Sequence, residues 1–237
     1  MLANAADDFS TVGNLSPDIL RPASFRSDVI DFVATALPAW RDRADRPRVT
    51  SETALTSQIC AHLNSTARHM KGWDILQFRV EERDERQAGR TIDLVAAPSG
   101  TSITIEGRRH IDFDTLLPIE CKRLPTPPDT NRDEMEYVHN RNATTGGIQR
   151  FKEGLHGAAH SLGAMIGYVQ EYDCAHWDQR IAGWIASLIG RVEGWAQADL
   201  LATVSADAEV RSARHSSVHT RSNGLAPISL IHLWIEM

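Results

Sequence analysis

The chain has 237 residues, of which 42% are hydrophobic and 24% are charged, and its formal net charge at pH 7 is -6. This length suffices for a sizeable core, and we expect one domain over residues 25–237 after a polar, flexible N-terminal segment, residues 1–24. The longest apolar runs are well short of the roughly 20 residues that cross a bilayer, and the start has no signal-peptide pattern. These features predict a soluble, cytoplasmic protein without a membrane partner.

The cysteines and the charges exclude several further classes. Cys60, Cys121 and Cys174 are odd in number and form no C-x-x-C pair, which disfavours a disulfide scaffold or a zinc knuckle. The negative net charge gives no global positive field that would attract nucleic acid. Basic residues do gather locally, in RDRADRPR (41–48), EGRRH (106–110) and RSARHSSVHTR (211–221). Each run taken alone is typical of a solvated surface.

Hydrophobic periodicity predicts helices and strands in mixed order. In chain order these are helix 27–37, helix 50–64, strand 73–82, strand 90–97, a short strand 101–107 as a hairpin partner, strand 116–124, a polar loop 125–147, a helix over 146–162 that opens with a flexible glycine pair, strand 163–171, helix 178–195, and strands 199–206 and 228–237. This order predicts an α/β fold, a sandwich in which helices flank a central mixed β-sheet.

Two of these elements carry acidic residues in apolar surroundings. The helix 50–64 begins at a Thr50 or Ser51 cap, and Glu52 lies at the inner edge of its apolar face. In the strand LLPIECKRL (116–124), Glu120 and Lys122 point to one face because side chains alternate along a strand. An acid, one residue and a lysine are common by chance, so the apolar strand around them is what makes the pattern informative.

This arrangement resembles the PD-(D/E)XK nuclease superfamily, the restriction-endonuclease-like phosphodiesterases, over roughly residues 50–171. The matching residues are Glu52, Asp93 in TIDLV, Glu120 and Lys122 in IECKR, and Gln149 in GGIQRF. Ile92 stands where the name-giving motif has proline. The long step from Asp93 to Glu120 needs an inserted hairpin.

The resemblance implies a nuclease that depends on a divalent metal, and the expected substrate is DNA, in double-stranded form. Asp93, Glu120 and the backbone carbonyl of Cys121 would hold Mg²⁺, with Mn²⁺ as a substitute, because Mg²⁺ prefers a few oxygen ligands and keeps several waters. Lys122 would position the attacking water and stabilise developing charge, and Glu52 and Gln149 would assist. The phosphate-binding residues would be Arg108, Arg109, Arg123, Arg150 and Lys152.

The resemblance also suggests a setting and partners. Nucleases of this size resemble effectors of prokaryotic antiviral defence and restriction systems, and such a protein would work as a homodimer or with a defence-system partner. Two other functions remain open. One is a non-catalytic nucleic-acid-binding or assembly module on the same scaffold, and the other is an RNase.

Several residues have alternative interpretations. Glu120 and Lys122 are also compatible with a plain ion pair on a strand, and Asp112 and Asp114 compete with Asp93 as the first acid. His156 and His160 have zinc-protease spacing, but Gly157 replaces the expected glutamate, so we interpret them as a core or surface pair. His215 and His219 share one face of a possible strand and are interpreted as structural.

Overall fold

The computed structural model describes residues 18–86, 88–127, 133–222 and 224–237. Over these residues the chain is a mixed α/β protein with four α-helices, a seven-stranded mixed sheet and a three-stranded sheet. None of the described helices is both long enough and apolar enough to cross a membrane. The predicted mixed sheet with flanking helices is therefore confirmed at this level.

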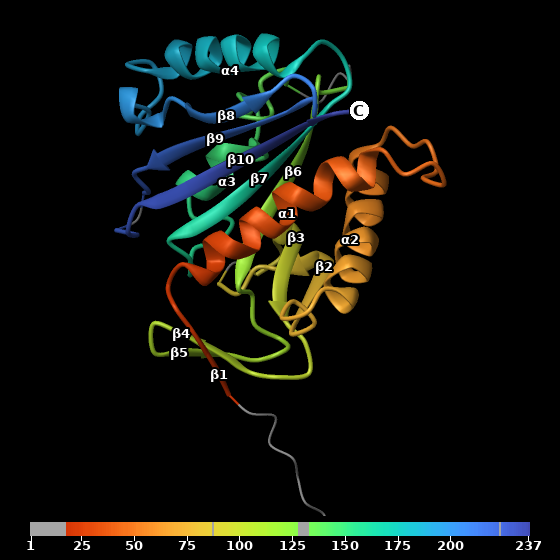
Figure 1. Cartoon of the computed structure of the whole chain (residues 1–237). Helices are drawn as coiled ribbons and strands as arrows, with labels where there is room; N and C mark the ends of the chain where they lie inside the picture. Colours follow the sequence, from red (N-terminus) through yellow and green to blue (C-terminus); the bar gives the residue numbers. More distant parts are fainter. Residues whose placement is uncertain (1–17, 87, 128–132, 223) are drawn as a thin grey trace, which may run out of the picture.

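The large sheet has the strand order β2-β3-β6-β7-β10-β9-β8 (Figure 1). Its strands are β2 (Leu76–Arg83), β3 (Thr91–Pro98), β6 (Leu117–Leu124), β7 (Leu162–Val169), β8 (Ala202–Asp207), β9 (Ser212–His219) and β10 (Ile228–Glu236). The three central strands β6, β7 and β10 are parallel to one another, and the outer neighbours pair antiparallel. Central parallel strands are normally covered on both faces, which matches their apolar sequences.

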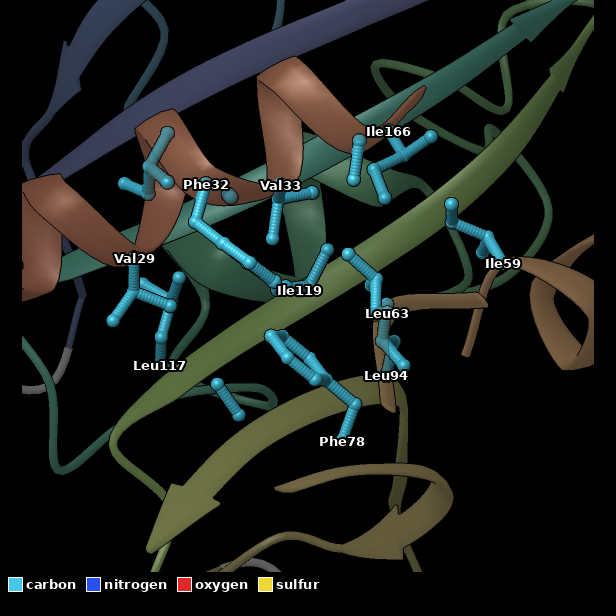
Figure 2. Close-up of a cluster of buried hydrophobic side chains, with 14 of the residues drawn as sticks. Val29, Phe32, Val33, Ile59, Leu63, Phe78, Leu94, Leu117, Ile119 and Ile166 are labelled. Atoms are coloured by element: carbon cyan, nitrogen blue, oxygen red, sulfur yellow. The ribbon is translucent and has the colours of Figure 1, made fainter. Parts of the chain in front are cut away.

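Helices cover both faces of this sheet. The helices α1 (Phe25–Arg41) and α2 (Glu52–His69) pack on one face, where side chains of α1 meet those of β6 in a buried apolar cluster. In Figure 2, Val29 and Val33 of α1 lie above Leu117 and Ile119 of β6. The short α3 (Gly147–Lys152) and α4 (Cys174–Leu188) contribute to a second apolar cluster with β7 and β10, and a 3-10 turn, η1 (Gln197–Asp199), follows α4.

Local capping fixes where α2 begins. Ser51 is its N-cap, and the Ser51 hydroxyl accepts a hydrogen bond from the Ala54 N–H at 3.3 Å. This cap satisfies one of the free N–H groups of the first turn. Glu52 is consequently the first helical residue, and its carboxylate projects from the end of α2 towards β6.

The predicted inserted hairpin is present. The strands β4 (Ile103–Ile105) and β5 (Arg108–His110) form an antiparallel pair between β3 and β6, which accounts for the long step between the two acids. The strand β1 (Ile19–Arg21) pairs parallel with β4 and completes the small sheet. The predicted flexible segment 1–24 is thus ordered where it is described, from residue 18, and residues 1–17 lie outside the described residues.

The predicted helix 146–162 was wrong over most of its length. It ends at Lys152 because the chain then turns at Gly154 and Gly157, which have φ angles of 66° and 61°. The glycine pair at its start is packed tightly rather than flexible. A Cβ on Gly147 would lie 2.8 Å from the carbonyl oxygen of Tyr137, so the backbone there has no room for a larger residue.

The segment 125–147 also differs from a solvated loop. Residues 128–132 lie outside the described residues, but Met135, Tyr137 and Val138 are buried in the second apolar cluster. These side chains hold the segment against β7 and β10. It therefore forms part of the packed surface that places α3.

Candidate functional site

The site lies where β3 and β6 separate. These strands pair over three residues only, and the last pair is Leu94 with Ile119. In the same register the next pair would be Asp93 and Glu120, whose side chains share one face of the sheet. The backbone pairing stops there, and the Cys121 N–H donates instead to Asp93 Oδ2 at 2.8 Å. A carboxylate thus replaces a backbone carbonyl as the partner of β6.

Three carboxylates from three elements meet one ammonium. Lys122 Nζ lies 2.8 Å from Glu120 Oε1, 3.4 Å from Glu52 Oε1 and 3.7 Å from Asp93 Oδ2. We call Glu52, Asp93, Glu120 and Lys122 the Lys122 cluster. Glu120 Oε1 and Asp93 Oδ2 both contact Lys122 Nζ. The distance between these two oxygens is therefore at most the sum of the two contact distances.

Glu120 is the most enclosed member of the Lys122 cluster. It is fully buried, and besides Lys122 it accepts hydrogen bonds from Arg150 at 2.5 Å and from His156 Nδ1 at 2.8 Å. Burial acts to raise the pKa of Glu120, but Lys122, His156 and Arg150 outweigh it and hold this pKa well below its ordinary value. These contacts therefore favour the ionised form of Glu120.

Lys122 stays protonated despite its burial. Burial alone would lower its pKa, yet the charges of Glu120, Asp93 and Glu52 together raise the pKa of Lys122 above its ordinary value. An ammonium that holds its proton this firmly can donate hydrogen bonds and supply positive charge. It cannot serve as a general base near neutral pH.

Asp93 is the carboxylate with the least compensation. Burial, together with the negative charge of Glu120, raises the pKa of Asp93 to about 6, and Lys122 and the Cys121 N–H offset only part of this. The side chain keeps 27% of its surface exposed. A half-buried carboxylate with excess negative charge beside it is a place where an added cation would be favourable.

A small cavity reaches Asp93 from the side of α2. Its volume is about 40 Å³, which is enough for an ion or one to three waters. Two other acids, Glu52 and Glu81, line it, and the remaining lining residues are Thr53, Thr56, Ser57 and Val80. Glu81 has a φ of 51°. Glu81 and Asp93 lie opposite each other and are left out of the β2 and β3 pairing, while the pairs on either side keep the same register, so the pairing is interrupted here without a bulge.

The donor set fits a hard divalent cation with few protein ligands. Within the described ranges, no group of three or more His, Cys, Asp or Glu side chains is arranged to hold a metal ion. Mg²⁺ is usually bound through one or two carboxylates and keeps several waters, so Asp93 with one neighbouring acid satisfies that requirement. Burial is the main cause of the raised pKa of Asp93, and the charge of Glu120 adds to it; a bound cation would favour the ionised form against both effects.

The sequence-predicted residues fall into two groups. Glu52, Asp93, Glu120 and Lys122 come together, and the backbone of Cys121 lies between the last two. Gln149 belongs to a different network, since its Oε1 accepts from the N–H groups of Asn140 at 3.1 Å and Gly146 at 3.3 Å, and its Nε2 donates to Glu153. The side chain of Gln149 thus fixes the chain that precedes α3 and does not contact the Lys122 cluster. Its neighbour Arg150 contacts Glu120 instead.

The five predicted phosphate-binding residues are dispersed. Arg123 lies next to the Lys122 cluster and donates to Gln170 at 2.7 Å, and Arg150 is engaged with Glu120. Lys152 is buried and its Nζ lies 2.6 Å from Asp199, so it is not on an exposed rim. Arg108 and Arg109 are exposed on β5, in contact with Glu85 and Asp18 respectively.

The rival acids lie elsewhere. Asp114 Oδ2 accepts the Ile111 N–H at 2.8 Å and so closes the turn after β5, and the Asp112 carbonyl accepts from Gln77. Of the histidines, His215 and His219 are buried in β9.

His156 is the neighbour of Glu120 that the sequence did not indicate. It is buried, as the core interpretation of the His156 and His160 pair expects, and its contact with Glu120 is the part that was not predicted. The glycines at 154 and 157 were the available signal, because they break the helical spacing and return the chain to β6.

Comparison of this chain with family models, curated proteins and solved structures finds no match.

We predict that His156→Ala lowers the free energy of unfolding by about 1 to 3 kcal/mol, because it leaves a buried carboxylate oxygen of Glu120 without its donor. His156→Asn restores an N–H near the position of Nδ1 and should recover part of the loss. Urea unfolding of both variants measures this, with the exposed His69→Ala as the control. A His156→Ala protein as stable as the wild type would contradict the proposed support of Glu120.

We predict that Asp93→Asn stabilises the protein above about pH 6 and not near pH 4. The folded pKa of Asp93 is raised from 3.8 to about 6, so the folded state binds this proton more tightly than the unfolded state, and ionisation costs stability as the pH rises through this window. One pKa unit corresponds to about 1.4 kcal/mol. After a discount for the exposed part of the side chain, we expect a gain of about 1 to 2 kcal/mol near pH 8.

The measurement is urea unfolding of wild type and Asp93→Asn at both pH values. The exposed Asp74→Asn serves as the control for the removal of one carboxylate charge. A loss of stability in Asp93→Asn near pH 8 would mean that the carboxylate is there chiefly as a partner of Lys122.

Proposed function

We propose that this chain is a divalent-metal-dependent nuclease that hydrolyses phosphodiester bonds, with DNA as the preferred substrate. The observation that carries the proposal is the Lys122 cluster, in which acids from α2, β3 and β6 surround one buried ammonium. Phosphodiester hydrolysis needs carboxylates to hold a metal and a cation near the developing negative charge. Both are present within a few ångströms.

The order of the elements supports the same proposal. Glu52 starts a helix, Asp93 lies on the second of the strands that follow, and Glu120 and Lys122 lie on the next strand of the large sheet, before α3 and β7. This is the order in which the PD-(D/E)XK residues were recognised in the sequence. The β4 and β5 hairpin accounts for the unusual spacing. A restriction-endonuclease-like core is therefore part of the proposal.

Asp93 and Glu120 are the residues that would hold the metal, with the Cys121 carbonyl as a third ligand. When bound, a divalent cation supplies charge neutralisation and lowers the pKa of a water molecule. Asp93 faces the small cavity and has the less complete set of partners, so it is the more accessible of the two. Glu120 is held in place by Arg150 and His156.

Lys122 would act by donating hydrogen bonds to the attacked phosphate or to the attacking water. Its raised pKa keeps it cationic in this role. Glu52 is a positioning residue, because one of its oxygens contacts Lys122 and the other accepts the Arg123 N–H at 3.0 Å. It thereby fixes the ammonium relative to the end of β6.

A plain structural ion pair is the less favourable explanation. Burying charges costs several kcal/mol per ion, and three acids from α2, β3 and β6 around one lysine add repulsion between the acids. Such an arrangement stabilises a fold poorly. It is typical of sites where burial and like charges are maintained for chemistry.

We predict that the purified protein cleaves plasmid DNA in the presence of Mg²⁺ or Mn²⁺, and that Lys122→Met reduces the rate by about 100-fold to 1,000-fold. Methionine keeps the volume of the side chain and removes the charge. Plasmid, single-stranded DNA and RNA are incubated with each protein, with EDTA as the metal-free control. The exposed Lys71→Met is the matched control and should cleave as the wild type does.

Thermal melts show whether each variant is folded. Folded Lys122→Met that cleaves at the wild-type rate would remove the catalytic role of Lys122. A wild-type protein that cleaves none of the three substrates with either metal would overturn the nuclease proposal, and preferential cleavage of RNA would change its substrate.

A further inference from the structure

A large groove lies beside the end of β6 and the chain between α1 and α2, and Arg123, the residue that follows Lys122, lines it. Its volume is about 760 Å³, far larger than a single phosphate group. The residues that line it come from the segment 41–50, from β6 and the end of β7, and from the chain at residue 211. We call it the arginine groove because each of its walls contains at least one arginine.

The charge of the arginine groove is opposite to that of the whole chain. Its described lining includes the acids Asp42 and Glu171 and six arginines, which are Arg41, Arg43, Arg46, Arg48, Arg123 and Arg211. The chain as a whole carries a formal net charge of -6. A positive groove on an acidic protein concentrates the attraction for an anion at one place, since acids repel it elsewhere.

The arginines differ in how far they are already engaged. Arg41 is buried, paired with Asp42 at 2.6 Å and bonded to the Val210 carbonyl, so it serves to hold the groove together. Arg48 and Arg211 are exposed, and the contact of Arg211 with Asp42 is a long 3.7 Å. Arg48 and Arg211 are thus the arginines with the greatest freedom to bind a ligand.

The groove is joined to the cluster through the backbone. Arg123 lines the groove, and its N–H donates to Glu52, which contacts Lys122. On the other wall, Gln170 donates to the Thr50 carbonyl at 2.9 Å and accepts from Arg123. The groove and the Lys122 cluster are therefore neighbours at the end of β6, linked through Arg123 and Glu52.

We propose that the arginine groove binds the sugar-phosphate backbone of a nucleic-acid strand and guides it to the Lys122 cluster. This inference rests on the proposed nuclease function and adds the surface on which the substrate lies. Arginines from three separate parts of the chain suit several successive phosphates, whereas one free phosphate would need a single tight set of donors. The binding is electrostatic and independent of base sequence.

The test is a charge reversal at the two most available positions. Fluorescence anisotropy measures binding of a labelled short DNA duplex, and of its single strand, at several salt concentrations in EDTA, so that metal-dependent cleavage cannot occur. Arg48→Glu/Arg211→Glu is compared with Arg68→Glu/Arg191→Glu. The control changes the net charge equally, at exposed arginines near the ends of α2 and α4 that do not line the arginine groove.

We expect Arg48→Glu/Arg211→Glu to weaken binding at least about tenfold and to reduce the slope of log K against log salt by about two. The control double variant should bind within about twofold of the wild type. Inorganic phosphate, added at the concentration of nucleotide phosphate, should not displace the DNA.

Each remaining outcome overturns the inference. Equal weakening in both double variants would mean that only net charge matters, and displacement by inorganic phosphate would indicate a site for a free anion. Unchanged binding in Arg48→Glu/Arg211→Glu, together with cleavage by the wild type, would reject the groove and leave the nuclease proposal standing. Absence of cleavage by the wild type would instead reject the function itself.

Discussion

The site depends on a buried ammonium that only its acidic neighbours make tolerable. Moving a lysine out of water costs several kcal/mol unless charged partners compensate. Glu120 on β6, Asp93 on β3 and Glu52 on α2 supply that compensation for Lys122. The positive charge of the same ammonium also offsets the repulsion between the three carboxylates. One side chain thus ties the start of α2 to the two strands where they separate.

Compensation within the cluster is unequal, and this inequality points to function. Glu120 has Arg150 and His156 besides Lys122, and its pKa lies below its ordinary value. Asp93 has fewer partners, and its pKa is raised to about 6. A fold selected for stability alone would gain from removing this unbalanced carboxylate. Its presence beside a small cavity supports the proposal that this site binds a cation.

Much of the fold and of the cluster could be predicted from the sequence. The alternation of apolar and polar residues located the strands that carry Asp93 and Glu120. Because side chains two residues apart in a strand point to the same face, the segment LLPIECKRL placed Glu120 and Lys122 on one face. The preference for Asp93 over Asp112 and Asp114 agrees with the contact between Asp93 and Lys122. These features depend on local geometry, which the sequence specifies directly.

The remainder depends on how distant segments meet. The apolar spacing over 146–162 favoured a long helix, although Gly154 and Gly157 indicated turns, and the contact of His156 with Glu120 depends on where those turns return the chain. Whether Gln149 or Arg150 faces Glu120 depends on the rotation of a six-residue helix, which packing of Gly147 against Tyr137 decides. The arginine groove brings together basic runs some 170 residues apart, through Arg41 and the carbonyl of Arg211.

Calorimetric titration of Mn²⁺ into the metal-free protein tests the central claim most directly, because it requires no knowledge of the substrate. The titration is done near pH 8, where Asp93 is ionised. The account predicts binding to the wild type, loss of that binding in Asp93→Asn, and retention in Lys122→Met, which removes a positive charge from the site. Binding that is equal in the wild type and in folded Asp93→Asn would contradict the claim that the Lys122 cluster is a metal site.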